Sequence, residues 1–466
     1  MKLSVRKIAE ITGGRLSPAG AEVVVSGIST DSRTIRPGEL FVPLRGPKYD
    51  GHDFLLRALQ NGAAACLSEE VIAGLKVPVI QVEDSLRALG DLAAAHRRGY
   101  RGPLVAVTGS SGKTTTKEML AAILERTAPG LKSAGNFNNL VGVPLTLFGL
   151  RPESHRWTVI EMGMSARGEI ARLAEIAAPT LGLITNIGPA HLETLHGLDG
   201  VARAKGELFA ALKPGAVAVV NADDPRVLAL PVANGVRRIL YGLSGDAEVR
   251  AEDVEARGRQ VRFRLHIGGQ SAEVVLPVAG RFNVSNALAA VAAARALDVP
   301  LDVIVAGLCG FSPLQGRMQL HTLASGALLL KDDYNANPLS MGAALEALDQ
   351  LEGGGRRIAV LGDMLELGDE SRRLHREVGA RAARHCDLLL LLGDMAEAMA
   401  DGARAAGLSA RRIRIAADHD EAAGCLARVL RKGDRVLVKG SRGMRMERIA
   451  DRLLSTDDGK AGKGGA

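Results

Sequence analysis

The sequence predicts an α/β protein with three domains built around mainly parallel, doubly wound sheets. The chain has 466 residues, which at about 150 residues per domain favours three domains. From residue 103 onward, short apolar runs that end at a glycine or an aspartate alternate with helix-length segments. This alternation is typical of buried parallel strands joined by crossover helices. The series stops near residue 314 and a second one of the same kind follows, which indicates a further domain.

Residues 1–100 predict a small mixed α/β N-terminal domain. Strand-like runs at 22–29 and 39–46 are followed by a helical stretch at 52–63. The glycine- and arginine-rich sequence that ends at Pro103 predicts a linker to the next domain.

Residues 101–313 predict a central domain with a mostly parallel sheet. Its strand-like runs lie at 103–109, 157–163, 181–188 and 216–224, and its helical segments at 113–128, 168–179 and 282–297. Between 247 and 278 the pattern changes to a strict apolar–polar alternation. That change predicts an antiparallel hairpin or small sheet attached to the parallel core.

Residues 314–456 predict a C-terminal Rossmann-like α/β domain. Its strand-like runs lie at 327–333, 356–363, 387–394, 411–418 and 435–441, with a clear helical segment at 371–385. Residues 457–466 are polar and glycine-rich, so we expect them to form a disordered tail.

Composition excludes several classes of function. Aromatic residues make up only 3% of the chain, which argues against a base-stacking surface for single-stranded nucleic acid. The formal charge of +7 suits an anionic ligand such as a nucleotide, but the basic residues are spread along the chain, so no nucleic-acid partner is expected. The four cysteines form no CxxC pair, which favours reduced thiols. Without a signal-peptide pattern or a run of about 18 apolar residues, we expect a cytoplasmic protein with no membrane span.

The sequence TGSSGKTT, from Thr108 to Thr115, is the sharpest local signal, and it makes the central domain P-loop-type. It follows an apolar run and opens a helical pattern, so its glycines and the helix N-terminus can surround a phosphate. Lys113 can reach the β- and γ-phosphates of ATP, and the Thr114 hydroxyl can bind Mg²⁺. A strict P-loop has a glycine where this chain has Val107. The predicted ATP-binding residues here are Gly109, Ser110, Ser111, Gly112, Lys113, Thr114 and Thr115; the alternative is a Gly/Ser-rich turn with a surface lysine.

Two further side chains follow apolar strands of the same domain. Glu161 ends one strand-like run and His191 follows another. The carboxyl ends of parallel strands converge on one crevice, so both could hold Mg²⁺ there. The alternatives are a capping glutamate and a structural histidine, and Mg²⁺ prefers oxygen to imidazole.

The order of the motifs resembles the Mur ligase family, the ATP-dependent amide-forming enzymes of peptidoglycan synthesis. The motifs are TGSSGKTT, IEMG, NIGPAHLETLHGLDGVARAKGEL, GRFNVSNALAA, GRM, DYNANP and LVKGSR, and the resemblance covers nearly the whole chain. The signatures DSRTIRPGELFVPLRG, AGNFNNLVGVP and VLGDMLELGDES are similar to those of the family member that uses UDP-N-acetylmuramoyl-tripeptide (UDP-MurNAc-tripeptide) and D-alanyl-D-alanine. The resemblance therefore implies these two small-molecule substrates.

The resemblance also implies roles for individual residues. Lys113, His191 and Lys205 would be catalytic, and Mg²⁺ would be held by Thr114, Glu161, His191 and, as N6-carboxylysine, Lys205. Asn283 and Asn286 would contact adenine, Arg317 the phosphates and Asp332 the ribose. Relatives usually have serine after that aspartate where this chain has Asp333, so either aspartate could meet the ribose. Ser32 and Arg33 would contact the uridine diphosphate, and Asn138 and Asn139 the muramyl peptide.

The implied reaction is amide-bond formation through an acyl phosphate made with ATP. A monomer is expected, since nothing in the sequence indicates an obligate assembly. Two alternatives remain open: a sister ligase or folylpolyglutamate synthetase that adds a single amino acid, and a P-loop nucleotide-dependent regulatory module that performs no ligation.

Overall fold

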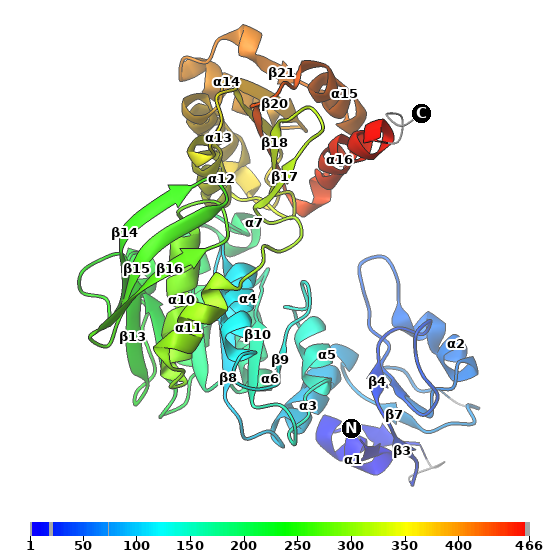
Figure 1. Ribbon diagram of the computed structural model, residues 1–466. Coiled ribbons are helices and arrows are strands. Elements are labelled where there is room, and N and C mark those ends of the chain that lie inside the picture. The colour runs from blue at the N-terminus through cyan, green and yellow to red at the C-terminus, as the bar shows by residue number, and fades with distance from the viewer. Residues whose placement is uncertain (1, 18–21, 73, 462–466) are drawn as a thin grey trace.

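The computed structural model describes residues 2–17, 22–72 and 74–461, and it confirms the predicted α/β class. Among the described residues, three large sheets follow one another along the chain, each with its own helices, and a small two-stranded sheet accompanies the first of them. The C-terminal part, yellow to red in Figure 1, lies on the central part, and the blue N-terminal part lies to one side of it. Among the described residues, no helix is both long enough and apolar enough to cross a membrane.

The N-terminal sheet has the order β2-β7-β6-β5-β4 and is parallel except for β2. Its strands are β2 (Arg15–Leu16), β4 (Ile28–Ser29), β5 (Leu40–Phe41), β6 (Ala65–Ser68) and β7 (Val79–Gln81). The helices are α1 (Val5–Thr12), η1 (Gly51–Phe54), α2 (Leu55–Gln60) and α3 (Ser85–Arg97). The single strand expected over 22–29 is wrong: β3 (Val24–Val25) pairs with β1 (Leu3–Ser4), whereas β4 pairs with β5, so the chain changes partner between them.

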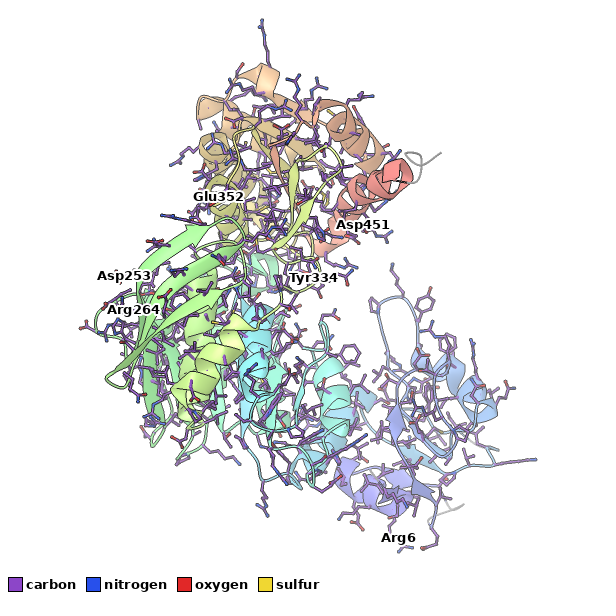
Figure 2. All side chains as sticks on the ribbon, viewed as in Figure 1. Arg6, Asp253, Arg264, Tyr334, Glu352 and Asp451 are labelled. Carbon is purple, nitrogen blue, oxygen red and sulfur yellow. The ribbon has the colours of Figure 1, made fainter. Side chains whose placement is uncertain are left out.

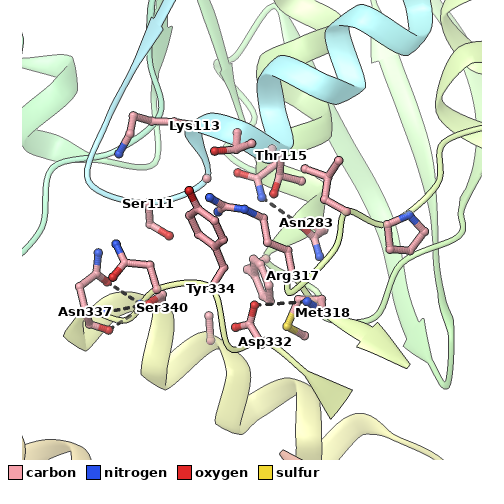
Figure 3. A pocket seen from close by; sticks show the side chains of 18 of the residues that line it. Ser111, Lys113, Thr115, Asn283, Arg317, Met318, Asp332, Tyr334, Asn337 and Ser340 are labelled. Carbon is pink, nitrogen blue, oxygen red and sulfur yellow. Dashed lines mark hydrogen bonds between the residues drawn. The ribbon is translucent and has the colours of Figure 1, made fainter. Parts of the chain in front are cut away.

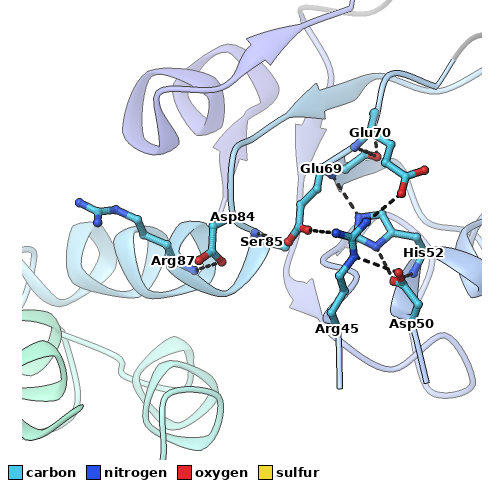
Figure 4. A network of polar contacts seen from close by, with 9 residues as sticks. Arg45, Asp50, His52, Glu69, Glu70, Asp84, Ser85 and Arg87 are labelled. Atoms are coloured by element: carbon cyan, nitrogen blue, oxygen red, sulfur yellow. Dashed lines mark hydrogen bonds and ion pairs between the residues drawn. The ribbon is translucent and has the colours of Figure 1, made fainter. Parts of the chain in front are cut away.

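A polar network fixes the loop before η1 in this domain (Figure 4). Arg45 forms ion pairs with Asp50 (2.9 Å), Glu69 (3.1 Å) and Glu70 (2.8 Å). The His52 Nδ1 lies 2.6 Å from Asp50, while its Nε2 accepts a hydrogen bond from the Glu69 backbone (3.1 Å). Hydrogen bonds from His52 lower the pKa of Asp50 to about 2. The network ties the loop to the end of β6.

The central sheet has the order β16-β15-β14-β13-β12-β11-β8-β10-β9. Its parallel strands are β8 (Leu104–Thr108), β9 (Gly130–Lys132), β10 (Trp157–Glu161), β11 (Leu181–Ile184), β12 (Val217–Asn221), β13 (Arg237–Gly242) and β14 (Val249–Arg257). Alternate residues of β8 face opposite sides: Leu104 and Ala106 pack with helices α5 (Gly142–Phe148), α6 (Glu169–Ala177) and α8 (Leu198–Ala210). Val105 and Val107 pack with α4 (Lys113–Leu124), α10 (Asn283–Ala296) and α11 (Leu301–Cys309). Both faces are therefore covered, which explains the continuous apolar runs. The short helices α7 (Leu192–Leu195) and α9 (Pro225–Leu228) complete this part.

The alternating segment forms an antiparallel arm on this sheet, as predicted. β15 (Gln260–Ile267) pairs antiparallel with β14 and with β16 (Gln270–Leu276). Exposed and buried residues alternate along β15 because one face packs on the core and the other meets solvent. On the exposed face Arg264 pairs with Asp253, 3.3 Å away (Figure 2).

The C-terminal sheet has the order β17-β18-β22-β19-β20-β21, with only β17 antiparallel among its described strands. The strands are β17 (Gln319–Thr322), β18 (Leu328–Lys331), β19 (Arg357–Gly362), β20 (Leu388–Leu392), β21 (Ile413–Ile415) and β22 (Arg435–Lys439). One face packs on α12 (Pro338–Gln350), α13 (Ser371–His385) and α14 (Ala396–Ala405), the other on α15 (His419–Val429) and α16 (Glu447–Ala461). The 3₁₀ turns are η2 (Gly368–Glu370), η3 (Ala410–Arg412) and η4 (Arg442–Met444).

The expected tail is wrong over 457–461, which continue α16, and 462–466 lie outside the described residues. A polar composition was taken to indicate disorder. A helix that has already formed can extend through polar residues, however, because each added residue gains a backbone hydrogen bond.

Candidate active site

A pocket lies where the carboxyl ends of the central strands face the C-terminal part. The P-loop lines one wall, and residues from beyond position 310 line the opposite wall (Figure 3). The predicted site residues that line it are Ser110, Ser111, Gly112, Lys113, Thr114, Thr115, Asn138, Glu161, Asn283, Asn286, Arg317 and Asp332. Segments more than 200 residues apart in sequence therefore meet in one place.

The P-loop needs glycine at two positions. Gly109 has φ +149°, and a Cβ there would lie 1.8 Å from the Thr185 hydroxyl oxygen. Gly112, the N-cap of α4, has φ +81°, and a Cβ there would lie 2.2 Å from the Asn286 side-chain oxygen. The Lys113 ammonium donates a hydrogen bond to the carbonyl oxygen of Gly109 (2.7 Å). The amine thus lies folded over its own loop, beside the free N–H groups of the first turn of α4.

Glu161, the last residue of β10, offers a free carboxylate oxygen beside this loop. The side-chain amide of Asn138 donates to its Oε1 (2.8 Å), whereas Oε2 is buried and has no hydrogen-bond partner. A buried carboxylate oxygen without a partner is costly unless a cation or donor meets it. With the Thr114 hydroxyl on the same pocket, the donors are the oxygen ligands that Mg²⁺ prefers, so these residues fit that ion.

The two asparagines of α10 are buried rather than exposed. Asn283 Nδ2 donates to the Ala279 carbonyl (2.8 Å), and Asn286 Nδ2 donates to the Asn283 side-chain oxygen (3.0 Å). These hydrogen bonds fix the orientation of both amide groups, which lie three residues apart on one face of the helix. Neither asparagine is therefore a solvent-exposed polar position.

The C-terminal wall contains Arg317, Asp332 and Tyr334. The Arg317 guanidinium lies 4.5 Å from the centre of the Tyr334 ring, a cation–π contact. Asp332 accepts hydrogen bonds from the Met318 backbone (3.2 Å) and from Lys439 (2.6 Å). These contacts hold both charged groups toward the P-loop.

Asp333 lines a different cavity, of about 430 Å³, which Tyr334 also lines. Its carboxylate lies 3.7 Å from Lys331 and its Oδ2 has no hydrogen-bond partner. Burial raises the pKa of Asp333 to about 6, although Lys331 opposes the shift. Of the two aspartates, Asp332 is therefore the one that lines the pocket.

His191 and Lys205 do not line the pocket. Lys205, on α8, is buried, and burial together with the nearby Lys113 ammonium lowers its pKa well below the usual range. His191, just before α7, has its Nδ1 paired with the carboxylate of Glu366 from the C-terminal part. That contact lowers the pKa of Glu366.

Ser32 and Arg33, which were expected to contact the uridine diphosphate, do not line the P-loop pocket. Gly109 and Asn139 do not line it either. Ser32 is buried in the N-terminal part, and Arg33 pairs with Asp31 (2.7 Å), lowering the pKa of Asp31 to about 2. The Asn139 side chain accepts a hydrogen bond from the Gly142 backbone (2.8 Å) at the start of α5. The structure does not bring these three side chains together with the P-loop pocket.

Three residues were missed by the sequence analysis as individual site residues. Lys439 and Asn337 lie inside the motifs LVKGSR and DYNANP, so their signal was present. Asn337 donates to the Ser110 carbonyl (3.0 Å) and so joins the C-terminal part to the P-loop. Glu366 lies in VLGDMLELGDES, where nothing local distinguishes it from an exposed carboxylate.

Family models match along the chain in the order of the three sheets. The Mur ligase family catalytic domain matches residues 24–97, the Mur ligase middle domain 107–294, and the Mur ligase glutamate ligase domain 316–442. The UDP-N-acetylmuramoyl-tripeptide–D-alanyl-D-alanine ligase of Bacillus subtilis is 35% identical over 460 residues, covering 98% of this chain and 99% of the relative. The chain belongs to the Mur ligase family.

Other Mur ligases agree with this assignment. The same-named ligase of Escherichia coli is 38% identical and covers 86% of this chain and 88% of its own length. A crystal structure of MurF from Acinetobacter baumannii superposes with a TM-score of 0.91 at 34% identity, covering 98% of this chain and 99% of that one. MurF from Thermotoga maritima, solved in complex with ADP, gives a TM-score of 0.83 at 30% identity, covering 93% and 98%.

Proposed function

We propose that this Mur ligase joins D-alanyl-D-alanine to UDP-MurNAc-tripeptide and converts ATP into ADP and phosphate. One observation carries the proposal: Lys113, Glu161, Arg317 and Asp332, brought from both parts of the chain, line a single pocket around the P-loop. Relatives that match over nearly the whole chain bear the name of this ligase. The paired N-terminal and C-terminal signatures support the same substrates.

The pocket suits phosphoryl transfer. Lys113 and Arg317 bring positive charge from opposite walls, and the first turn of α4 supplies N–H donors for the phosphate oxygens. Thr114 and Glu161 would hold Mg²⁺, which when bound offsets phosphate charge. Asp332, held by Lys439, would accept from the ribose hydroxyls, and Asn283 and Asn286 would contact adenine.

The reaction needs the tripeptide carboxylate close to the γ-phosphate of ATP. Transfer of that phosphoryl group gives an acyl phosphate and ADP; the amine of D-alanyl-D-alanine then attacks the acyl carbon, and phosphate leaves. Water would hydrolyse the acyl phosphate. Arg317 and Tyr334 line the C-terminal wall opposite the P-loop, and closure of this wall over bound substrates would limit the access of water.

Lys205 is the residue for which we propose carboxylation. Its buried amine lies near Lys113, and burial together with that ammonium lowers its pKa, which favours the neutral form that can add to CO₂ and lose a proton to give an anionic carbamate. The anionic carbamate would be attracted to the nearby Lys113 ammonium, which disfavours a charged amine at this position. We expect Lys205→Ala to lose most of the ligase activity and to regain part of it with added short-chain carboxylates. Full activity of untreated Lys205→Ala would refute the carbamate.

The test of the function is a panel of amine substrates. Purified protein with ATP, Mg²⁺ and UDP-MurNAc-tripeptide should release ADP and phosphate when D-alanyl-D-alanine is added, and the product mass should rise accordingly. ADP release driven by a single amino acid would indicate a sister ligase, and folate-dependent release a folylpolyglutamate synthetase. ATP hydrolysis without any dependence on the carboxylate would indicate a regulatory P-loop module.

Three organisational features remain part of the proposal. The domain limits 1–100, 101–313 and 314–456 are supported by the sheets, whose strands fall within them. A monomer is proposed because nothing in the sequence indicates an obligate assembly. The reaction is proposed to take place in the cytoplasm, where its nucleotide-linked substrate and ATP are available.

A further inference from the structure

The loop that opens α4 is braced by the two residues that follow the neighbouring strand β11. The Asn186 side chain engages both backbone groups of Ser111: its Oδ1 accepts from the N–H (2.9 Å), and its Nδ2 donates to the carbonyl (3.1 Å). The Thr185 hydroxyl donates to the same Ser111 carbonyl (2.6 Å). The Asn186 carbonyl in turn accepts from the Ser110 N–H (3.0 Å). Two successive residues of the loop are therefore fixed from the end of β11.

Further hydrogen bonds extend this brace into the sheet. The Ser110 hydroxyl donates to the Gly188 carbonyl (2.9 Å) and accepts from the Gly188 N–H (2.9 Å). On the other side, the Thr185 carbonyl accepts from the Asn221 side-chain amide (2.7 Å) and from the Tyr241 hydroxyl (3.2 Å). Asn221 ends β12 and Tyr241 lies in β13. The loop is thus tied, through β11, to two further strands of the central sheet.

The brace lies outside the pocket and leaves the phosphate-binding groups free. Ser110 and Ser111 line the pocket, whereas Thr185 and Asn186 do not. The N–H groups of Ser110 and Ser111 are already engaged, while the N–H groups of the first turn of α4 have no partner within the helix. Those free N–H groups are the donors that a phosphate would meet.

We propose that Asn186, assisted by Thr185, is a positioning residue for the binding of nucleotide phosphates. It holds the segment before α4 in the shape that directs the first turn of the helix at the phosphate oxygens, and it does not touch the ligand itself. A loop ordered in advance does not have to be ordered by the ligand, so less affinity is lost on binding. This inference rests on one part of the proposed function, the binding of ATP phosphates by the P-loop, and on no metal ligand.

The chain offers a matched pair of threonines for the test, one at each end of β11. Thr185→Val removes the hydroxyl bond to Ser111 and keeps the shape of the side chain. Thr180, just before β11, bonds the backbone of Leu104 in β8 in the same manner: its Oγ1 accepts from the N–H (3.0 Å) and donates to the carbonyl (3.3 Å). Thr180→Val is therefore the control, because it removes a comparable bond at the end of the strand away from the P-loop.

The experiment compares the affinities of the full chain for AMP, ADP and ATP, measured by calorimetric titration in EDTA so that no metal contributes. We expect Asn186→Ala to lower the ratio of ATP affinity to AMP affinity by about 10-fold, the effect of losing one or two hydrogen bonds. Thr185→Val should lower the ratio less, and Thr180→Val should leave it unchanged. Hydrogen exchange of the peptide that contains Ser110 and Ser111 should be faster in Asn186→Ala without nucleotide and unchanged in Thr180→Val.

The ratio separates positioning from a general effect on folding, and thermal unfolding checks that each variant is folded. An unchanged ratio in Asn186→Ala, or an equal loss of affinity for AMP and ATP, would overturn the inference. Should Asn186→Ala not fold, the comparison of Thr185→Val with Thr180→Val decides, and equal ratios in those two variants would overturn it. Unaltered protein that binds ATP no more tightly than AMP would instead contradict phosphate binding by the P-loop, and dipeptide-dependent ADP release tests the proposed function separately.

Discussion

The Lys113 amine is held by a carbonyl of its own loop before any phosphate arrives. Its hydrogen bond to Gly109 satisfies a buried ammonium whose pKa is lowered by burial and by Arg317, with Glu161 opposing the shift. A triphosphate would replace that carbonyl with anionic oxygens, which are stronger partners. The loop therefore has its binding conformation before ATP arrives. On binding, Lys113 would exchange the Gly109 carbonyl for a phosphate oxygen as its hydrogen-bond acceptor.

Gly112 tests how closely this loop depends on backbone conformation. Gly112→Ala combines a positive φ with a Cβ 2.2 Å from the Asn286 side-chain oxygen. We expect it to weaken ATP binding by at least 10-fold, measured by calorimetric titration. Gly424→Ala, in α15 with no atom within 4 Å of the added Cβ, is the control and should bind ATP normally. Equal affinity in both variants would contradict the steric argument.

Asp333 supplies a pH-dependent contribution to stability. Its pKa of about 6 in the folded protein lies above the usual aspartate value of 3.8, so the folded state binds the extra proton. The stabilisation is complete below about pH 4 and disappears as the pH rises through 6. At pH 7.5 we therefore expect Asp333→Asn to raise the free energy of unfolding by about 1 kcal/mol, allowing for solvent screening. Urea unfolding at pH 4 and pH 7.5 measures the difference, and a gain confined to pH 4 would contradict the sign.

At the scale of single elements, α12 shows how one residue can serve both a helix and the site. Asn337 caps α12, accepting from the Ser340 N–H (2.9 Å), and its amide group also donates to the Ser110 carbonyl of the P-loop. The cap fixes where the helix begins, and the second bond fixes where the helix lies relative to the nucleotide pocket. The same helix packs Met341 and Leu345 into the core shared with the central domain.

The two roles of Asn337 can be separated by substitution. Asn337→Ala should lose about 1 kcal/mol of stability with the cap, and its KM for ATP should rise. Asn337→Asp keeps an equally good N-cap but loses the donor to Ser110, so stability should be retained while the KM for ATP still rises. Thermal unfolding and steady-state kinetics measure the two effects. A normal KM for ATP in Asn337→Asp would show that the contact with the P-loop does not matter.

At the scale of the whole molecule, one hydrophobic cluster continues from the central sheet into the C-terminal helices. It contains Ile184 and Leu208 from the centre together with Leu345 and Leu361 from the C-terminal part. The N-terminal sheet has clusters of its own, and α3 links it to the centre, because Leu89 faces the N-terminal core and Ala93 the central one. The ATP pocket thus lies between two parts that share a core.

Unfolding should reflect this division. Trp157, the one tryptophan of the chain, lies buried in β10 and reports on the central domain. ADP that binds only the folded pocket would raise the free energy of unfolding by about 2.7 kcal/mol at 100 times its dissociation constant. We therefore expect ADP to shift the unfolding transition seen by Trp157 fluorescence to a higher denaturant concentration. Far-UV circular dichroism should show a second unfolding transition, from the N-terminal part. ADP should leave the denaturant midpoint of that transition unchanged. Coincident transitions with and without ADP would instead indicate one cooperative unit.

Local pattern in the sequence was enough for the α/β class, the P-loop, the antiparallel arm and the candidate ligands Thr114 and Glu161. These depend on hydrophobic period and on residues next to a strand end, both of which are local. Local pattern could not separate Asp332 from Asp333, because neighbouring residues after a strand point to opposite sides. It also could not pair Glu366 with His191 or place Asn337 on Ser110. Those contacts depend on how the C-terminal part packs on the central domain, which is decided by side chains distant in sequence, so only the tertiary structure determines them.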